Sequence, residues 1–268
     1  MTTGKLDVST LLSDDVMWTL LGTLYLRAYE SRSPHSILRD HYAAEALERI
    51  EYDEPALARR LRPKTNQFLV ALRGKQLDTW TTAFLDRHPD ATVLQVGCGL
   101  DSRALRLQKP KNVRWYDLDL PDVIAIRRRL FEERDGHWMI AASVTDDDWL
   151  RAIPNDRPTL IIAEGLFPYL QTDDVRKLLQ RLSDHFGTGE LLFDSLAQWM
   201  TRFIKVFVFS FRDGHEIESG NNRLRLQETS PFSTFWPLIH SPGIRRLYQV
   251  GHKFKAWRNL MVSYRFTF

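Results

Sequence analysis

Apolar and polar residues follow different patterns in the two parts of this chain. From residue 91 onward, short apolar runs alternate with longer amphipathic stretches, as buried strands and surface helices do. Buried strands are predicted at Thr92–Val96, Val113–Leu118, Trp138–Ser143, Thr159–Ala163 and Glu190–Ser195. Helices are predicted between them, at Ser102–Leu107, Asp122–Glu133, Asp146–Ala152 and Asp173–Phe186. This alternation predicts an α/β fold with a parallel sheet built from right-handed crossovers.

The first 90 residues carry apolar side chains at helical intervals and are predicted to form an N-terminal helical cap over the mouth of the sheet. The segment Ser13–Asp15 can cap a first helix, and Ser33–Pro34 should end it. Further helices are expected at His35–Ile50 and Lys64–Arg87. Residues 91–268 then form the core, and the cap and the core together make one compact unit.

Residues 196–240 interrupt the alternation of strands and helices. Aromatic side chains recur there every four positions, at Trp199, Phe203, Phe207 and Phe211. This spacing predicts an aromatic helix, and the polar run Asp213–Asn222 predicts a mobile loop. We interpret 196–240 as an insertion after the fifth strand that covers an apolar or ring-bearing substrate, with plain core packing as the alternative. An antiparallel hairpin of Arg246–Val250 and Leu260–Phe268 is expected to close the sheet.

Glycines and acids follow the first two predicted strands. Gly97 and Gly99 come directly after Thr92–Val96, where the chain must turn sharply and a ligand can approach its backbone. Asp119 ends the second strand, 20 residues after Gly99, about where a carboxylate binds the ribose hydroxyls of a nucleotide-like cofactor. Ligands of open α/β sheets bind at the carboxyl ends of the strands, so these residues predict a cofactor site there.

The residues after Gly99 indicate which cofactor this is. A dinucleotide site has the pattern G-x-G-x-x-G/A, in which the last small residue lets helix and strand pack closely around a diphosphate. Ser102 stands in that place here, and Asp101 precedes it. An acid repels a diphosphate but is compatible with the ammonium group of a methionine moiety. S-adenosyl-L-methionine, which has a ribose and an adenine but no phosphate, therefore fits the pattern better than NAD.

Three longer motifs resemble a known family. They read VGCGLDSR, YDLDLPDVIAIRRRLF and IIAEGLFPYL, and they are similar to successive motifs of the leucine carboxyl methyltransferase superfamily, in particular its polyketide-type (tetracenomycin-like) O-methyltransferase branch. The resemblance runs from about Thr23 through Ser195. It implies a Rossmann-like class I S-adenosylmethionine-dependent methyltransferase fold, with a mainly parallel seven-stranded sheet whose last strand is antiparallel.

The resemblance also implies contacts with the cofactor. Arg73 is expected to hold the cofactor's carboxylate by a charge-assisted fork, and Glu164 of the AEG motif is expected to contact the cofactor. Without the resemblance, Arg73 would be interpreted as a surface residue and Glu164 as a turn cap. The other predicted cofactor-binding residues lie at strand ends: Asp101, Asp117, Ser143 and Val144, the last two beside the adenine. No catalytic residue is predicted, and Arg27 and Tyr169 are candidates for positioning the methyl acceptor.

Composition excludes several other classes of protein. The 268 residues are 43% apolar and carry a formal net charge of +3, which gives a substantial core and only a mild positive charge. The densest basic run, Arg127–Arg129, is interpreted as the solvated edge of an amphipathic helix, so nucleic-acid binding is not predicted. Cys98 is the single cysteine, which excludes an internal disulfide and suits a reducing cytoplasm. No signal peptide, membrane span or metal-ligand spacing is evident, so no membrane partner and no metal are predicted.

The sequence does not name the methyl acceptor. A carboxylate is ionised at neutral pH and needs only orientation, whereas a phenol, with a pKa near ~10, needs help from a base. No histidine stands within the strand-end motifs, so the predicted substrate is a small acid, aromatic or polyketide-like. Three alternatives stay open: a protein C-terminal carboxylate as the acceptor, an NAD-dependent oxidoreductase, and a cofactor-binding module without catalysis. The oligomeric state is not predicted.

Overall fold

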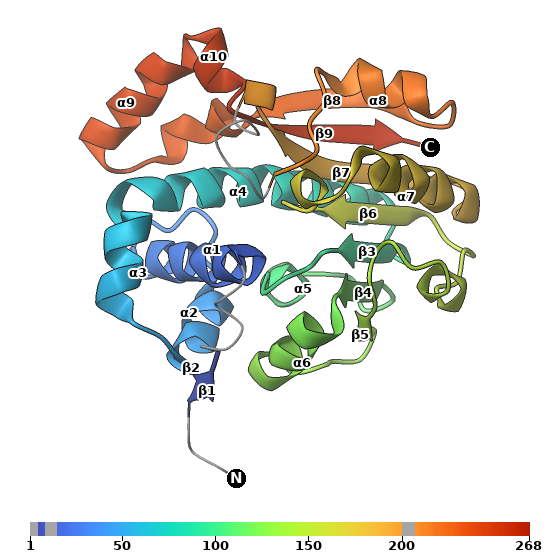
Figure 1. Cartoon of the computed structure of the whole chain (residues 1–268), viewed down its shortest axis with the longest axis horizontal. Helices are drawn as coiled ribbons and strands as arrows, with labels where there is room; N and C mark the ends of the chain where they lie inside the picture. The colour runs from blue at the N-terminus through green and yellow to red at the C-terminus, as the bar shows by residue number, and fades with distance from the viewer. Residues whose placement is uncertain (1–4, 9–14, 200–206) are drawn as a thin grey trace.

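The computed structural model describes residues 5–8, 15–199 and 207–268. Its central element is a seven-stranded sheet in the order β5-β4-β3-β6-β7-β9-β8 (Figure 1). The strands are β3 (Thr92–Val96), β4 (Arg114–Asp119), β5 (His137–Ala141), β6 (Thr159–Ala163), β7 (Gly189–Leu196), β8 (Arg225–Pro231) and β9 (Met261–Thr267). The first five pair in parallel, and β9 runs antiparallel to both β7 and β8. The predicted mainly parallel sheet with an antiparallel last strand is confirmed.

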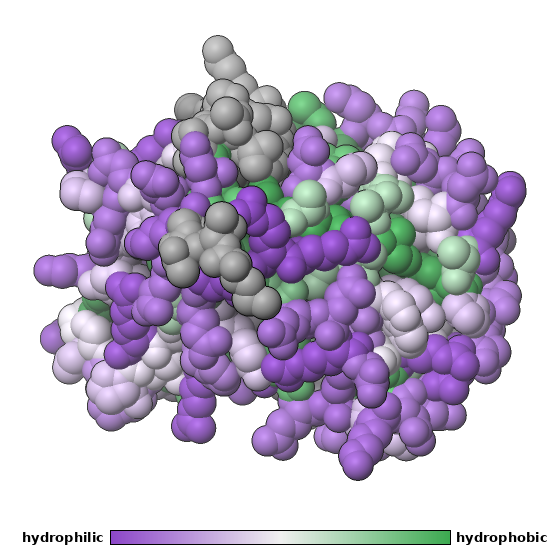
Figure 2. Space-filling model, turned by 90° about the horizontal axis from the view of Figure 1, so that it is seen from below, coloured by the Kyte–Doolittle hydropathy of each residue, from purple (hydrophilic) through white to green (hydrophobic). Residues whose placement is uncertain are grey.

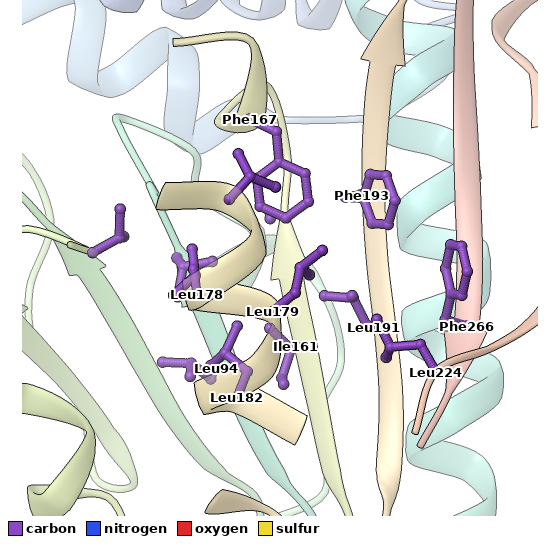
Figure 3. Close-up of a cluster of buried hydrophobic side chains, with 14 of the residues drawn as sticks. Leu94, Ile161, Phe167, Leu178, Leu179, Leu182, Leu191, Phe193, Leu224 and Phe266 are labelled. Carbon is purple, nitrogen blue, oxygen red and sulfur yellow. The ribbon is translucent and has the colours of Figure 1, made fainter. Parts of the chain in front are cut away.

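Helices cover both faces of this sheet. Apolar side chains of α7 (Thr172–His185) pack on one face, against Leu94, Ile161 and Leu191 (Figure 3). On the opposite face, Leu77, Trp80 and Phe84 of α4 (Pro63–Arg87) pack against alternate residues of the same strands, such as Val93. Successive residues of a strand point to opposite faces, so residues 93 and 95 of β3 face α4 while 94 and 96 face α7. Gln95 therefore lies on the α4 side.

The first three N-terminal helices lie to one side of the sheet, and the fourth runs along its face (Figure 1). They are α1 (Asp15–Ser31), α2 (His41–Glu48), α3 (Glu54–Leu61) and α4, with a two-stranded sheet of β1 (Leu6–Asp7) and β2 (Ile50–Glu51) beside them. The second helix begins at His41 rather than at His35, because Arg39 has a φ of +54° and the Asp40 carboxylate accepts a hydrogen bond from the Ala43 N–H. That arrangement is an ordinary N-terminal cap. Ser13 and Asp14 of the predicted first cap lie outside the described residues.

The remaining helices connect the strands or close the C-terminal region. They are α5 (Arg103–Arg106), α6 (Pro121–Leu130), α8 (Gly214–Gly220), α9 (Pro242–His252) and α10 (Lys255–Arg258), with short 3-10 helices at Trp149–Ala152, Phe167–Tyr169 and Phe232–Leu238. The predicted helix Asp146–Ala152 is thus reduced to one 3-10 turn at its end.

One of the two strands predicted for the C-terminal hairpin is wrong. Arg246–Val250 lies inside α9, which begins at Pro242 and buries Tyr248 and Gly251. Proline at the first helical position and buried residues three apart favour a helix there. The last strand lies between β7 and β8 and is antiparallel to both, and β8, whose side chains are mostly exposed, takes the place of the predicted hairpin partner. A strand that is mostly exposed need not alternate in hydrophobicity, so its sequence does not reveal it.

Two predictions for the 196–240 insertion are also corrected. The polar run Asp213–Asn222 contains α8, because the Asp213 carboxylate accepts hydrogen bonds from the N–H groups of His215 and Glu216. The predicted aromatic helix falls partly on residues 200–206, which lie outside the described residues, and residues 207–211 are not helical. Phe209 and Phe211 pack into the core on the α7 side of the sheet.

The interpretation of Arg127–Arg129 as a solvated edge holds for two of its three residues. Arg128 and Arg129 are exposed, whereas the Arg127 side chain is completely buried. Hydrophilic side chains dominate the face drawn in Figure 2, although hydrophobic ones gather from its centre toward the right-hand edge. Within the described parts of the chain, no helix is long and apolar enough to cross a membrane.

Candidate active site

A cavity of about 450 Å³ lies at the carboxyl ends of β3, β4, β6 and β7. The strands and the turns after them form its floor, α1 and α4 contribute one wall, and the 3-10 helix Phe167–Tyr169 contributes another. Eight of the nine predicted cofactor-binding residues line it, and so do both positioning candidates: Arg73, Gly97, Gly99, Asp101, Asp119, Ser143, Val144, Glu164, Arg27 and Tyr169. Asp117 does not.

The turn after β3 brings bare backbone to the cavity floor. Gly97 and Gly99 have φ values of +63° and +51°, in the left-handed region that favours glycine. A Cβ atom added to Gly97 would lie 2.8 Å from Cδ1 of Leu166, which packs directly over this glycine. A side chain at residue 97 would therefore be strained and would narrow the space available to a ligand.

Asp119 is the last residue of β4, and its carboxylate has free hydrogen-bond acceptor positions. Its Oδ2 accepts a hydrogen bond from the Gly99 N–H at 2.7 Å and its Oδ1 accepts one from the Leu120 N–H at 2.8 Å. A carboxylate offers about four acceptor positions, so each oxygen can accept one further bond. Burial raises the pKa of Asp119 from its ordinary value, and the two N–H groups oppose that rise. The two backbone bonds fix the carboxylate at the cavity edge, where two neighbouring hydroxyl groups can donate to it.

Asp117 has a different position, and the prediction that it binds the cofactor is corrected. It is completely buried beside Arg127, whose Nη2 and Nε both donate to its Oδ2. His137 Nε2 lies 2.7 Å from the same oxygen, and Trp115 Nε1 donates to Oδ1 at 2.9 Å. Burial alone would raise the pKa of Asp117, but Arg127 and His137 outweigh it and the pKa is lowered. Asp117 stabilises the core beneath the site.

Asp101 lines the cavity, but its carboxylate is already occupied. Oδ1 contacts Arg106 Nη1 and lies 3.2 Å from Arg27 Nη1. Oδ2 lies 2.8 Å from Arg103 Nη1 and accepts a hydrogen bond of 2.8 Å from Gln95 Nε2. Burial raises the pKa of Asp101, yet the three arginines lower it well below its usual value. Asp101 is thus a fixed negative charge in the cavity wall.

Arg73 joins β6 and β7 at the cavity. Its Nε lies 2.9 Å from Glu164 Oε1, and its Nη1 lies 3.5 Å from Asp194 Oδ2. Arg103 Nη2 donates to the other oxygen of Glu164, which holds that carboxylate from two sides. The Gly165 N–H donates to Asp194 Oδ1 at 2.6 Å. The guanidinium is therefore rigidly held while it still faces the cavity.

Another part of the cavity lining is apolar and carries one pair of hydrogen-bonded hydroxyl groups. Tyr169 donates its O–H to Thr19 Oγ1 at 2.9 Å and packs edge-on against Phe207, with ring centroids 5.2 Å apart. Leu166 and Leu196 line the same region. Ser143 and Val144 line the far part of the cavity after β5, where the Ser143 hydroxyl bonds Thr145.

These residues fit S-adenosyl-L-methionine. The cavity volume lies within the range of small-molecule sites. The glycine turn carries no side chain that would crowd a ligand beside Leu166. Asp119 offers two acceptor positions for ribose hydroxyls, and Arg73 offers a positive charge to a carboxylate. The fold and this strand-end cavity together define a class I S-adenosylmethionine-dependent methyltransferase.

Comparison with known proteins identifies the family. The family model of leucine carboxyl methyltransferase matches residues 20–183, and this chain belongs to that family. It is 43% identical to the tetracenomycin polyketide synthesis O-methyltransferase TcmP of Streptomyces glaucescens, over 84% of this chain and 83% of the relative. It is 37% identical to the S-adenosyl-L-methionine-dependent methyltransferase dpfgK of Gibberella zeae, over 72% and 70%. The predicted enzyme class, an S-adenosylmethionine-dependent O-methyltransferase, and the predicted cofactor are confirmed.

A solved structure supports the same fold. A crystal structure from Thermobifida fusca YX, of a candidate methyltransferase, superposes with a TM-score of 0.56 at 18% identity and covers 90% of this chain and 93% of that chain. At this identity the similarity concerns the fold alone.

The sequence-based prediction missed four polar residues that line the cavity: Thr19 and Thr23 of α1, and the strand residues Gln95 and Asp194. The two strand residues carried a signal. Each is a polar residue near the end of an otherwise apolar strand, in TVLQV and LLFDS. That pattern was the available signal, because a polar side chain in a buried strand needs a partner.

Proposed function

We propose that this enzyme methylates a carboxylate of a small acid that carries an apolar, ring-bearing body. The observation that carries the proposal is the mixed lining of the cavity, which combines the fixed charges of Arg73 and Glu164 with the apolar side chains of Leu166, Leu196 and Phe207. Among the described residues that line the cavity, none is a histidine or a lysine. The site thus offers orientation and an apolar surface rather than an imidazole or amine base.

We place the cofactor by its charges. Asp119 would accept hydrogen bonds from the ribose hydroxyls, Ser143 and Val144 would lie beside the adenine, and Arg73 would bind the carboxylate. Arg27, whose side chain is 5% exposed, would add positive charge on the same side. When bound, S-adenosylmethionine supplies an electrophilic methyl group on a positively charged sulfur. The Cys98 thiol, whose pKa burial raises well above its usual value, stays protonated beside it.

The chain's own contribution to the reaction is alignment and exclusion of water. Methyl transfer is an in-line displacement in which positive charge disperses, so a dry, oriented site supplies much of the rate. A carboxylate acceptor, with a pKa near ~4, arrives ionised and gives up no proton. Tyr169 and Phe207 would hold the ring of the acceptor. We propose residues 196–240 as the substrate cover and residues 1–90 as the cap that completes the site.

The relatives favour a small molecule over a protein as the acceptor. TcmP takes part in polyketide synthesis by its name, and the match to it extends over 84% of this chain. A polyketide-like acid is therefore our preferred acceptor, and the C-terminal carboxylate of a protein is the alternative. The single buried thiol remains compatible with a cytoplasmic enzyme.

Asp194 favours a second candidate, an acceptor with a hydroxyl group. Its carboxylate lines the cavity and is 1% exposed, and burial raises its pKa. A carboxylate in this position could accept the proton of a phenol. Aspartate is a weak base for a group with a pKa near ~10, so the carboxylate acceptor remains preferred.

The nature of the product tests the two candidates. The enzyme is incubated with a library of aromatic acids and phenols and with S-adenosylmethionine labelled in its methyl group. A methyl ester releases labelled methanol in mild alkali, whereas an aryl methyl ether does not. Alkali-labile product from the acids supports the proposal, and alkali-stable product from the phenols contradicts it.

A further inference from the structure

Helix α9 carries a row of exposed apolar side chains. Leu247 and Val250 are 54% and 47% exposed, and Phe254, which follows the helix, is 62% exposed. These positions are three and four apart, so they share one side of the helix, while Tyr248 and Gly251 are buried on another. Single exposed apolar residues are ordinary on a protein surface, but a row of three large ones is typical of a surface that contacts a partner.

Exposed cations accompany this row. They are Arg245, Arg246, Lys253 and Lys255. Within the described parts of the chain, none of these four side chains forms an ion pair with a carboxylate. The chain also has no aspartate or glutamate after Glu228, so no acid on this segment balances their charge. The three apolar residues and the four cations are called the α9 surface below.

The charge of the α9 surface makes a second copy of this chain a poor partner. If two copies packed α9 against α9 about a twofold axis, Arg246 and Lys253 would approach the same cations of the other copy. Like charges repel, and the α9 surface has no acid to offset the repulsion. An anionic partner is instead attracted by every one of the four cations, so charge complementarity selects an anionic partner.

The position of α9 favours a lipid bilayer over an acidic protein. Helices α9 and α10 lie at an outer corner of the molecule (Figure 1). A helix at a projecting corner can insert leucine, valine and phenylalanine between lipid headgroups while its lysines and arginines contact the phosphates. A helix that lies on a bilayer in this way need not span it.

We infer that the α9 surface docks the enzyme on membranes that contain anionic lipids. Leu247, Val250 and Phe254 enter the boundary between headgroups and acyl chains, and the cations lie at the level of the phosphates. The docking is reversible, because one short helix with three apolar residues buries little surface. No residue of the α9 surface lines the cavity, so the failure of this inference would leave the proposed function untouched.

Co-sedimentation with vesicles tests the docking. The full chain is mixed with vesicles of phosphatidylcholine and phosphatidylglycerol in equal parts, or of phosphatidylcholine alone. We expect at least about tenfold tighter binding to the anionic vesicles, because each basic residue near such a surface strengthens binding roughly fivefold. The binding should weaken as the salt concentration rises. Equal binding to both kinds of vesicle, or binding to neither, would overturn the inference.

Two double variants test the apolar and the charged parts separately. Leu247→Ser with Phe254→Ser removes most of the apolar row, and Arg246→Gln with Lys253→Gln removes two cations. Each double variant should weaken binding to the anionic vesicles by roughly tenfold or more. All four side chains are exposed, so the fold and the affinity for S-adenosylhomocysteine should be retained. Folded double variants that bind the vesicles as the wild type does would contradict the inference.

A matched control shows whether any exposed cation would have the same effect. Arg176→Gln with Lys177→Gln removes two exposed cations from α7. Charges away from the docked surface are screened, so this variant should bind the anionic vesicles within about twofold of the wild type. A loss equal to that of Arg246→Gln with Lys253→Gln would mean that net charge alone drives the binding, and it would overturn the assignment to α9.

A fluorescent label at residue 254 distinguishes a bilayer from other partners. Cys98 is buried, so Phe254→Cys can be labelled selectively with a dye whose emission shifts to the blue in apolar surroundings. We expect that shift with anionic vesicles and not with polyglutamate, a soluble acidic polypeptide. A shift with polyglutamate alone would assign the surface to an acidic protein and overturn the inference. Self-association of the wild type in sedimentation velocity, abolished by Leu247→Ser with Phe254→Ser, would assign it to a second copy and overturn the inference as well.

Discussion

Asp117 and Asp119 lie two residues apart on β4, one in a closed ionic core beneath the sheet end and the other at the open cavity edge. Asp117 is surrounded by Arg127, His137 and Trp115, and its pKa is lowered against the effect of burial. Among the described residues, Asp119 accepts hydrogen bonds from two backbone N–H groups alone, and burial raises its pKa. In sequence the two residues look equivalent. They differ in how many hydrogen bonds each carboxylate already accepts from the protein. A carboxylate whose acceptor positions are all occupied stabilises the fold, whereas one with free acceptor positions can bind a ligand.

The largest expected effect tests the cavity itself. Gly97→Val should abolish measurable affinity for S-adenosylhomocysteine, because a branched side chain opposes a φ of +63° and its Cβ would lie 2.8 Å from Leu166. Calorimetry measures the affinity, and circular dichroism checks that the variant is folded. Gly243→Val in α9, where an added Cβ meets no atom within 4 Å, is the matched control. A folded Gly97→Val protein with wild-type affinity would place the cofactor elsewhere.

The next effect concerns the ionic core. Asp117→Ala leaves Arg127 buried without its carboxylate, and we expect the free energy of unfolding to fall by roughly 3–5 kcal/mol in urea titrations. The folded pKa of Asp117 is lowered, so the stability from this pair is present above the unfolded carboxyl pKa of ~3.9 and is lost as pH falls through the folded value. The difference between the variant and the wild type should therefore shrink in acid. Unchanged stability with lost cofactor affinity would reverse the assignment.

Replacing Asp119, at the cavity edge, by alanine should reduce the affinity for the cofactor product more than the stability of the fold. Asp119→Ala should weaken S-adenosylhomocysteine by roughly 2–4 kcal/mol, counting two charged hydrogen bonds of ~1.5–3 kcal/mol each with partial overlap. Its free energy of unfolding should change much less than that of Asp117→Ala, because no buried cation loses its partner. Calorimetry and urea titration of the two variants side by side check this. A stability loss equal to that of Asp117→Ala, with intact affinity, would contradict it.

The comparison also explains what could be predicted from the sequence. The strands Thr92–Val96 and Thr159–Ala163 were predicted with their observed bounds, because buried parallel strands are continuous apolar runs. The glycine turn and Asp119 followed from their spacing. β8 was missed because its side chains are mostly exposed, and Arg246–Val250 was assigned to a strand because its helix buries few residues.

Local sequence does not reveal whether residues far away in the chain already hydrogen-bond or ion-pair with a polar side chain. Asp101 is occupied by Arg27, which is 74 residues earlier in the chain, and Arg127 pairs with Asp117 from a helix whose other arginines are exposed. Gln95 and Asp194 were overlooked because a polar residue in a buried strand can either hydrogen-bond within the protein core or contact a ligand. Only the positions of the partners distinguish the two cases.

The smallest expected effect is the response of the chemical step to pH, and Asp194, a buried carboxylate that lines the cavity, is the residue that tests it. A carboxylate acceptor is ionised throughout the neutral range, so single-turnover rates should change by less than about twofold between pH 6 and 8. A phenol that gives its proton to a base should instead gain rate as pH rises, since more of the base or of the phenolate is then available. Burial raises the pKa of Asp194, so this residue is the titratable group to test. Asp194→Asn removes a base but keeps an acceptor for the Gly165 N–H, and it should leave the flat profile unchanged if the acceptor is a carboxylate. A rate that climbs steeply with pH in the wild type, and that drops when Asp194 is replaced, would assign the proton transfer to Asp194 and exclude the carboxylate acceptor, while the methyltransferase assignment would stand.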